Sequence, residues 1–467
     1  MVTEITARTN EAIALKNAGR HVEAIDLLAN IATMAPDNLA LQHNHAAALG
    51  DAGRNREAVM VLERAFQRGL NAPQSWLVFA RALAGVQDFE RARTAFFQLL
   101  RFNPYSPDVH KELAQLIWMQ TGEQDKALEI VNEALRANPA AKALYITRAQ
   151  ILGQTGDANA EYAEIRRLAD QNPNTPELSM ALCNSALACE KIAKAVSYGK
   201  AAFDAAREND SAVSAYATAL LAAGEASQAA GVIEILRARQ PVNQFFIALE
   251  ATAWRLTGDP RYEAIFDYDS LVFAAPLEPP AAWRTLDAYL ADLTEALEEA
   301  HDFQEHPFNQ SVRHGSQISS VTGSDNPALK AYGDAALRPV RRFTEALGVG
   351  DDVLRNRNIG GFRFFSTWSI SLPPGGFHVN HVHPEGWLSS ACHIRPVPDD
   401  PENERAGWLK FGEPGITTAP ALTPQRFVKP EPGVLVLFPS YMWHGTVGFE
   451  AGDARLTIAA DIVPASA

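Results

Sequence analysis

The sequence predicts two domains of different class: an α-helical solenoid over residues 1–275 and a jelly-roll β-domain over residues 276–467. A chain of 467 residues has room for two or three domains. In the first half, one turn position recurs at steps of 34 or 35 residues, and the segments between turns are rich in alanine. After about residue 270, proline, glycine, aromatic and β-branched residues take over. These observations favour paired helices followed by short strands.

The recurring turn position defines the repeat unit of the first half. Its occupants are Gly19, Gly53, Gln87, Gly122, Gly156, Glu190, Gly224 and Gly258. Five places after most of them stands a small residue, namely Ala24, Ala58, Ala92, Ala127, Ala195 and Ala229. Prolines close many units, at Pro36, Pro104, Pro139, Pro173 and Pro241. Glycine suits a left-handed cap, alanine lets two helices cross closely, and proline ends the second helix. We expect seven or eight helix–turn–helix units over residues 3–275.

This 34-residue period, with glycine, then alanine, then proline, resembles the tetratricopeptide repeat. The stretch GRHVEAIDLLANIATMAPDN carries the resemblance most closely. Glu161 and Glu263 replace the small residue in the fifth and eighth units, and the last unit is predicted to cap the array and dock onto the second domain. The resemblance implies a scaffold whose concave surface binds a peptide or protein partner. Cys183 and Cys189, six residues apart on one helical segment, are interpreted as core residues.

Composition excludes several classes of protein. The net charge of −14 argues against nucleic acid as the main partner, because phosphate binding needs a basic surface. No run of about 18 apolar residues exists, which excludes a membrane-spanning helix. The first residues, MVTEITARTNEAIALKNAG, lack the apolar core of a secretory signal. Three cysteines are too few for a disulfide scaffold, so we expect a cytoplasmic protein.

The second half predicts two helices, at 285–300 and 327–347, separated by the polar loop HPFNQSVRHGSQ. Five β-like runs come after them: GFRFFSTWSISL, WLSSACHIRPV, GWLKF, GVLVLF and RLTIAADIV. Turns such as PPGG and KPEPG separate them. Several short strands with Gly/Pro turns are typical of a sandwich or jelly roll.

Three histidines form the candidate metal site. His381 and His383 lie two apart on an extended segment, so their side chains point the same way. His444 follows a later strand of the same domain. An iron centre that activates oxygen uses three protein ligands on one face, commonly two histidines and a carboxylate. We favour His381, His383 and His444 as the ligands.

Two other ligand sets stay open at this point. His383-Pro-Glu385 is a literal His-x-Glu pair, which with His444 would supply the usual carboxylate. Pro384, however, restricts the backbone between His383 and Glu385. The third possibility is a two-histidine site with water in the third position.

Arg455 begins the last strand, 11 residues after His444, where a basic residue can bind the far carboxylate of a chelating keto acid. The segments His306–Gln317 (HPxxQSxRxGxQ), His381–Pro384 (HxHP) and Gly433–His444 (GxLVLFPSxxxH) resemble a bacterial branch of the 2-oxoglutarate- and iron(II)-dependent oxygenases. The resemblance covers about residues 280–467 and implies a double-stranded β-helix. It also implies iron(II) as the metal, with His381 and His444 among its ligands. For the co-substrate 2-oxoglutarate, it implies Arg455 as the main ligand, assisted by His393 and Thr457.

The remaining polar and aromatic residues have weaker assignments. The loop residues Gln310, Ser311, Arg313 and Gln317 are structural or, for Arg313, contact substrate. His314 and His378 are interpreted as structural or rim residues. Trp387 and Trp443 flank the ligands and either wall the pocket or pack in the core. Asp399, Asp400, Glu402 and Glu404 form an acidic insertion that we expect to be a solvated loop.

These features predict a 2-oxoglutarate- and iron(II)-dependent dioxygenase that hydroxylates a peptide or protein recruited by the repeat array. One alternative is a non-catalytic adaptor with a degenerate oxygenase domain. Another is a three-histidine dioxygenase that does not use 2-oxoglutarate, although the pair Arg455 and Thr457 after His444 weighs against it.

Overall fold

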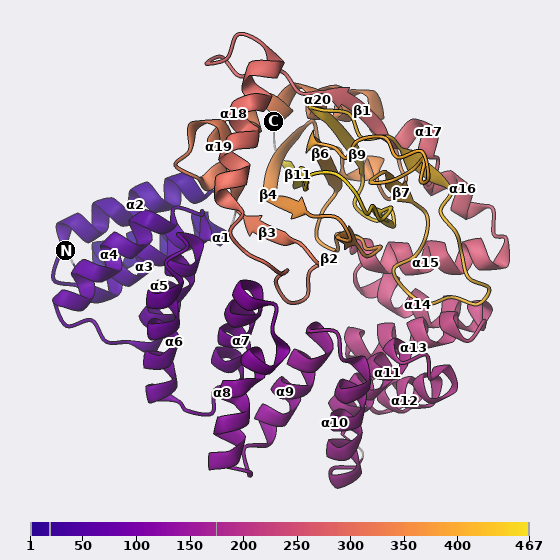
Figure 1. Ribbon diagram of the computed structural model, residues 1–467, viewed down its shortest axis with the longest axis horizontal. Helices are drawn as coiled ribbons and strands as arrows, with labels where there is room; N and C mark the ends of the chain where they lie inside the picture. The colour runs from indigo at the N-terminus through magenta and orange to yellow at the C-terminus, as the bar shows by residue number, and fades with distance from the viewer. Residues whose placement is uncertain (1, 18–19, 174, 466–467) are drawn as a thin grey trace.

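The computed structural model describes residues 2–17, 20–173 and 175–465. It confirms an N-terminal array of helix hairpins followed by a β-sandwich domain. The helices of the array form an arc, and the β-domain lies on the inner side of that arc (Figure 1). The paired helices are α1 (Val2–Asn17), α2 (His21–Met34), α3 (Leu39–Asp51), α4 (Asn55–Gln67), α5 (Pro73–Gly85), α6 (Phe89–Phe102), α7 (Pro107–Thr121), α8 (Gln124–Ala137), α9 (Lys142–Gln154), α10 (Ala158–Gln171), α11 (Pro176–Ala188), α12 (Ile192–Ala205), α13 (Asp210–Ala222), α14 (Ala226–Arg239), α15 (Gln244–Thr257) and α16 (Arg261–Ile265).

The backbone confirms the predicted repeat unit. The seven described turn positions all have positive φ: Gly53, Gln87, Gly122, Gly156, Glu190, Gly224 and Gly258. Gln87 and Glu190 adopt this left-handed conformation (φ 63° and 56°) without being glycine, so the hairpin geometry overrides the residue preference. Gly19, the first predicted turn, lies outside the described residues.

The small residues after the turns lie where the helices of a unit cross. All six predicted alanines, Ala24, Ala58, Ala92, Ala127, Ala195 and Ala229, have at most 1% of their surface exposed. Of the two cysteines assigned to the core, Cys183 is fully buried, whereas Cys189 caps α11 and is half-buried.

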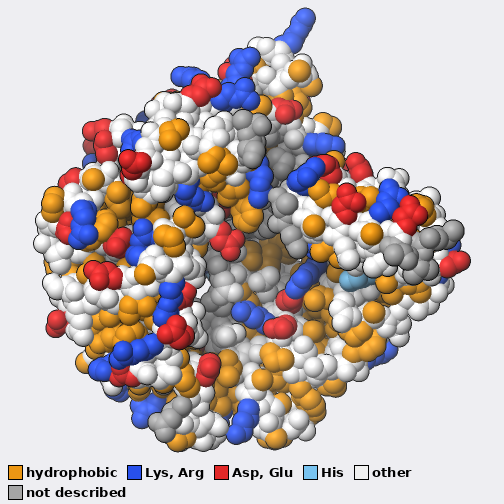
Figure 2. All heavy atoms as spheres, turned by 180° about the vertical axis from the view of Figure 1, so that it is seen from behind, with side chains coloured by type: hydrophobic (Ala, Val, Ile, Leu, Met, Phe, Trp, Pro, Cys, Tyr) orange, Lys and Arg blue, Asp and Glu red, His pale blue; other side chains and the backbone are white. Residues whose placement is uncertain are grey.

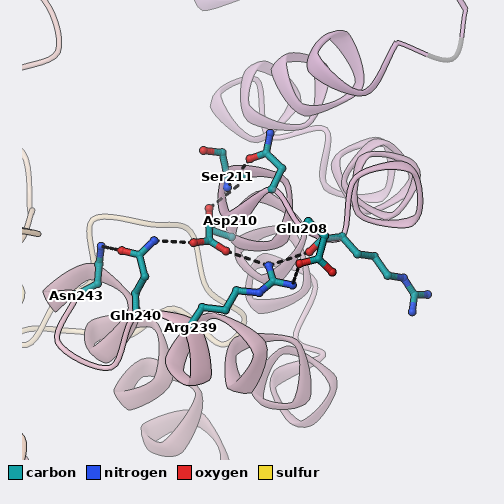
Figure 3. A network of polar contacts seen from close by, with 9 residues as sticks. Glu208, Asp210, Ser211, Arg239, Gln240 and Asn243 are labelled. Atoms are coloured by element: carbon teal, nitrogen blue, oxygen red, sulfur yellow. Dashed lines mark hydrogen bonds and ion pairs between the residues drawn. The ribbon is translucent and has the colours of Figure 1, made fainter.

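A polar network positions the last hairpin (Figure 3). Arg239, at the end of α14, bonds to Glu208 in the loop before α13 and to Asp210, the first residue of α13. Gln240 donates to the same Asp210 carboxylate and accepts from Asn243. The Asn243 side chain then caps α15 by accepting from the backbone N–H groups of its first turn. This network sets the start of α15, the helix that contacts the candidate site.

The last unit docks onto the β-domain, as predicted. After α16 come α17 (Tyr268–Leu271) and β1 (Phe273–Pro276), and β1 pairs antiparallel with β9. The β1 strand therefore spans the 275/276 division that the sequence suggests between the domains.

The β-domain contains one large and two small antiparallel sheets. Its other elements are α18 (Leu286–Ala300), β2 (Val312–Arg313), β3 (Ser316–Ser319), η1 (Val321–Gly323), α19 (Pro327–Lys330), α20 (Tyr332–Leu347), η2 (Arg355–Arg357), β4 (Gly361–Leu372), β5 (Phe377–His378), β6 (Leu388–Arg395), β7 (Leu409–Phe411), β8 (Arg426–Val428), β9 (Val434–Pro439), β10 (His444–Thr446) and β11 (Arg455–Ala465). The strand order is β1-β9-β6-β11-β4-β3 in the large sheet, with β10-β7-β8 and β2-β5 beside it. Within the described residues the large sheet is open at β1 and β3 and forms no closed barrel.

Helices cover one face of the large sheet. The predicted helix at 285–300 is α18, and the one at 327–347 is split at Ala331 into α19 and α20. Their apolar residues, such as Leu293 and Phe343, form one buried cluster with strand residues such as Leu388 and Leu437. The covered face leaves the opposite face of the sheet for polar side chains, and the candidate site lies there.

The loop at 306–317, predicted as a polar connection, is hydrogen-bonded to helices of the array. The N–H of Phe308 donates to Gln115 Oε1 at 3.0 Å, and the N–H of Asn309 donates to Gln154 Oε1 at 2.6 Å. The N–H of Gln304 bonds to the Met119 carbonyl at 2.8 Å. The β-domain is thus held at α7 and α9 as well as at α15. None of the helices in the described part of the chain is long and apolar enough to cross a bilayer.

Candidate metal centre

Backbone pairing brings the three histidines together across more than 60 residues of sequence. The N–H of His381 donates to the His444 carbonyl at 2.9 Å, and the N–H of His444 donates back at 3.1 Å. The N–H of His383 bonds to the carbonyl of Ser440, in the turn after β9. One nitrogen from each ring lies within 4.8 Å of the other two, so the three histidines are positioned to bind a metal ion.

Each histidine has its Nδ1 atom against a fixed acceptor. His381 Nδ1 lies 2.9 Å from the Val379 carbonyl, and His444 Nδ1 lies 2.9 Å from the Met442 carbonyl. His383 Nδ1 lies 3.1 Å from the Asp461 carboxylate. Since these oxygens only accept, Nδ1 carries the proton in all three rings, and Nε2 has a free lone pair.

His383 Nε2 lies 3.3 Å from His444 Nε2, and when both rings are in the neutral Nδ1–H form this contact has no proton to share. Two lone pairs face each other across it, which is repulsive unless a cation lies between them. Two nitrogens that bind one metal ion at about 2.0–2.1 Å, at 90° to 109°, lie about 2.8–3.4 Å apart. The separation fits adjacent ligands of one ion.

Burial favours the neutral form of two of the rings, those of His381 and His444. It lowers the pKa of His381 to about 3, and the neighbouring His383 ring lowers it further. The pKa of His444 is also held well below its usual range, mainly by burial. Trp368 stacks on His383 at 5.4 Å, and Phe438 packs on His444 at 4.6 Å. Neutral imidazoles among aromatic rings are the form that binds a divalent metal.

A hydrogen bond to Thr446 holds Arg455 close to the histidines. The guanidinium donates to Thr446 Oγ1 at 3.0 Å. His444 and Thr446 are two apart on β10, so they share a face about 7 Å apart along the strand. Only 2% of Arg455 is exposed, and burial lowers its pKa to about 10. No carboxylate among the described residues forms an ion pair with it, and a buried cation without a counter-ion is costly.

The residues around Arg455 have unused polar atoms. Arg455 also donates to His393 Nδ1 at 3.1 Å, which places the proton of that ring on Nε2. His393 Nε2, Arg455 Nε and Thr457 Oγ1 are buried and have no hydrogen-bond partner among the described residues. Three unpaired donors around a buried guanidinium fit a carboxylate of a small ligand.

Strand alternation explains why these groups share one face of the sheet. Arg455, Thr457 and Asp461 lie at even spacing on β11 and so point to one face of the sheet. On β6, His393 pairs with Thr457, and Ser389 pairs with Asp461. This face therefore carries both the carboxylate that holds His383 and the guanidinium of Arg455 with its unpaired neighbours.

Two cavities adjoin the histidines. The larger, of about 1640 Å³, lies between the array and the β-domain, and His381, His383 and Asp461 line it. The space-filling view from behind shows the molecule hollowed at its centre, with acidic and basic side chains on its walls (Figure 2). The smaller cavity, of about 730 Å³, is lined by His378 and Thr446. The larger cavity therefore reaches two of the three histidines, and the smaller one reaches residues close to them in the sequence but none of the three.

The other candidate residues predicted from the sequence are not part of the histidine group. Glu385 is exposed on the rim of the larger cavity and is not one of the three grouped residues. Trp387 is fully buried and bonds to the Leu354 carbonyl, and Trp443 packs against α15. Neither tryptophan is among the residues that line the two cavities. His314 is mostly exposed.

The loop residues and the acidic insertion lie apart from one another. Gln310, Ser311, Arg313 and Gln317 all line the larger cavity. The acidic insertion is a surface segment, with Asp399, Glu402 and Glu404 exposed and Asp400 half-buried. Asp399 forms an ion pair with Lys429.

Three residues have roles at the site that were not predicted from the sequence. Asp461 orients His383, and the sequence pointed to it as a carboxylate in a mostly apolar strand, at even spacing from Arg455 and Thr457. Thr446 holds Arg455, and its signal was its position two residues after His444. His378, interpreted as a structural or rim residue, stacks on His381 at 5.8 Å, and Ser311 bonds to its Nδ1.

Known proteins match the two halves separately. A family model described as "Putative 2OG-Fe(II) oxygenase" matches residues 366–461, which run from β4 to β11 and include all three histidines. Among solved structures, a tetratricopeptide repeat protein from Parabacteroides merdae is 16% identical, with a TM-score of 0.38, and the match covers 54% of this chain and 99% of that chain.

Two further solved structures are similar over shorter stretches. The MamA protein is 15% identical, with a TM-score of 0.30, covering 36% of this chain and 92% of that one. A thermophilic TPR protein from Thermus thermophilus is 20% identical, with a TM-score of 0.29, covering 39% of this chain and 99% of that one. No curated protein matches the chain. The chain thus joins an array of helix hairpins with the period of tetratricopeptide repeats to a β-domain that matches the 2OG-Fe(II) oxygenase family over residues 366–461.

Proposed function

We propose that this protein is a 2-oxoglutarate- and iron(II)-dependent dioxygenase that oxidises a peptide or protein segment held between the array and the β-domain. The observation that carries the proposal is the pair of adjoining sites. One nitrogen of each of the three histidines lies within 4.8 Å of the others, and a buried guanidinium with unpaired donors lies beside them, bonded to Thr446 two residues after His444.

His381, His383 and His444 would hold the iron, each fixed by its Nδ1–H bond. Arg455, with His393 and Thr457, would bind the far carboxylate of 2-oxoglutarate. When bound, iron(II) and 2-oxoglutarate together activate dioxygen for the oxidation of a C–H bond. The protein supplies orientation, charge and a partly dry pocket.

The two cavities suggest separate access for the two organic reactants. The smaller cavity reaches Thr446, the residue that holds Arg455, and its volume suits a small dicarboxylic acid. The larger cavity exceeds the roughly 300–1,000 Å³ of typical small-molecule clefts. Its walls come from both the array and the β-domain, which favours a polypeptide segment as the substrate.

Anaerobic titration with iron(II), then with 2-oxoglutarate, tests the proposal. We expect the visible charge-transfer absorption of the chelate, lost in His444→Ala. In Arg455→Lys the affinity for 2-oxoglutarate should fall by about tenfold or more, because a charge-assisted bond is worth about 1.5–3 kcal/mol. The matched control is His314→Ala, which removes an exposed histidine of the same domain.

The three-histidine donor set also fits a second candidate function, that of a dioxygenase that does not use a keto acid. If iron(II) binds and 2-oxoglutarate changes neither the absorption nor oxygen consumption, this second candidate replaces the first. If the protein binds no iron(II), both oxygenase assignments fail and the adaptor alternative takes their place.

A further inference from the structure

We propose that the substrate segment carries an acidic side chain, Asp or Glu, and that Arg313 binds its carboxylate beside the histidine group. The inference rests on the proposed function, because it names the substrate class of the same site. It also assigns Arg313 a specificity role that neither the family match nor the ligand geometry gives.

Arg313 is the cation of the larger cavity that lacks a carboxylate partner. Three arginines line this cavity. Arg81 forms two bonds to the Glu112 carboxylate, and Arg56 faces Asp325 at 3.6 Å. Within the described residues, Arg313 bonds only to backbone carbonyls.

The guanidinium of Arg313 is held in place and still has free donors. Its Nη1 atom donates to the carbonyls of Gln310 and Val312, at 2.6 and 2.7 Å. The side chain is half-buried, and no atom of it is both buried and unpaired, so its remaining N–H groups face the cavity. Burial lowers the pKa of Arg313 with no carboxylate to oppose the effect. An anion entering the cavity would relieve that desolvation and form a charge-assisted pair.

The position of Arg313 is next to the metal group. Arg313 lies on β2, which pairs with β5, and its direct partner on that strand is Phe377. The next residue of β5, His378, stacks on His381 and points to the opposite face of that strand. The link to the metal group is the shared cavity, which Arg313, His381 and His383 all line. A carboxylate on Arg313 would therefore hold a neighbouring part of the same substrate close to the three histidines.

The other charges of the cavity are mostly accounted for within the protein. Asp51 pairs with Lys16, and Asp461 bonds to His383. Among the lining residues, this leaves Glu385 as the carboxylate without a partner. The amides of Gln310 and Gln317 line the same cavity as Arg313, and after their one mutual bond each keeps donor or acceptor capacity for a peptide backbone. Polypeptide is the chemical class that brings a carboxylate together with amide groups.

A binding experiment on the full-length protein tests the inference. The probe is an immobilised set of nine-residue peptides with mixed flanking residues and a central Asp, Glu, Asn or Gln. Binding is measured anaerobically with iron(II) and 2-oxoglutarate present. We expect peptides with a central Asp or Glu to be retained about tenfold more than their amide counterparts, as one charge-assisted pair predicts. Equal retention of acidic and amide peptides would overturn the inference.

Variants assign the preference to one residue. Arg313→Met should abolish the preference for acidic peptides, and Arg313→Lys should retain part of it, because lysine keeps the charge and loses the planar fork. Arg81→Met is the matched control, since that arginine lines the same cavity and is already bonded to Glu112. Glu385→Gln should leave the preference intact. A preference that survives in Arg313→Met contradicts the assignment. If that variant does not fold, a preference undiminished in Arg313→Lys contradicts it.

The chelate absorption, recorded on the same samples, separates this inference from the proposed function. Arg313→Met should keep the absorption and lose only the acidic preference. Loss of the 2-oxoglutarate-dependent absorption in Arg313→Met would mean that Arg313 holds the co-substrate, which overturns the inference. An acidic preference in a wild-type protein that shows no absorption would support the binding site and reject the oxygenase.

Discussion

At the scale of single residues, the candidate centre depends on the group that lies behind each imidazole. Two of the rings are oriented by carbonyl oxygens of neighbouring residues, Val379 and Met442. The third, His383, is oriented by Asp461, whose other oxygen accepts from Ser389. A carboxylate behind a histidine raises the basicity of the ligand and fixes its tautomer. Since no carboxylate is among the three grouped residues, Asp461 is the carboxylate that contacts the histidine group.

Asp461→Asn is expected to weaken metal binding by about 10- to 100-fold, the usual effect of removing such a partner. The amide is nearly isosteric but lacks the charge, and it can present its NH₂ group to Nδ1 and favour the wrong tautomer. Anaerobic titration with iron(II) measures the change. Asp453→Asn, an exposed carboxylate of the same domain, is the control. Unchanged affinity in Asp461→Asn would mean that His383 is not a ligand.

At the scale of elements, α15 is a wall of the candidate centre. The Trp443 indole N–H donates to Thr252 Oγ1 at 3.0 Å, and Trp443 immediately precedes His444. Ala248 packs against Val382, which lies between the other two histidines. The N–H of Gln244 bonds to the carbonyl of Pro384 at 3.0 Å. One helix of the array thus contacts the neighbours of all three histidines.

Thr252→Val tests this wall. It leaves the shape of the side chain and removes the acceptor, so a buried indole N–H loses its partner at a cost of about 1–3 kcal/mol. We expect a lower free energy of unfolding and weaker iron(II) binding together, measured by denaturant unfolding and anaerobic titration. Thr257→Val on the same helix is the control, because that hydroxyl bonds only within α15. A change in stability without any change in metal affinity would show that α15 is structural scaffolding.

At the element scale, the fifth repeat unit also contains a partly buried carboxylate, Glu161, that makes stability depend on pH. Glu161 occupies the position that holds a buried alanine in most units, and its carboxylate lies over Gly153, where any side chain would collide with it. Burial raises the pKa of Glu161 to about 7 from its ordinary value near 4.5. The folded state therefore binds more protons than the unfolded state between those values, and stability falls as pH rises through this window.

Glu161→Gln should accordingly stabilise the protein at pH 8 and have little effect at pH 5, where Glu161 is already protonated in the folded state. The shift corresponds to roughly 3 kcal/mol, which partial exposure reduces to about 1–2 kcal/mol. Thermal unfolding of the wild type and the variant at both pH values measures the difference. Glu263→Gln, at the equivalent but exposed position of the eighth unit, is the matched control. Equal effects of Glu161→Gln at pH 5 and pH 8 would contradict the burial argument.

At the scale of the whole molecule, the array and the β-domain form one structure around a shared cavity. Contacts at α7 and α9 hold the loop before β2, and contacts at α15 hold the histidine segments. Gln87, at the turn after α5, also donates to the Ala300 carbonyl at 2.7 Å. The array therefore forms part of the walls of the candidate site, beyond any role in recruiting a partner.

Ligand binding should consequently protect the array as well as the β-domain. With iron(II) and 2-oxoglutarate at about 100 times their dissociation constants, binding stabilises the folded state by about 2.7 kcal/mol. Hydrogen exchange should slow by up to about 100-fold in β10, β11 and α15, and stay unchanged in α1 and α2 at the far end of the arc. Protection confined to the strands would show that the array is uncoupled from the site.

The sequence alone determined the repeat array, the main strands and the histidines that converge. Periodicity carries this information, because turns 34 residues apart and alternating polar residues depend on local geometry. Only the tertiary structure showed the double role of α15 and the contacts that hold the His306–Gln317 segment against the array. It alone also showed the parts played by Asp461 and Thr446. These depend on contacts between residues 9 to more than 190 positions apart, and no local spacing encodes which distant partner a buried polar group meets. The assignment of Arg313 likewise required knowing which of the cavity's cations already has a carboxylate.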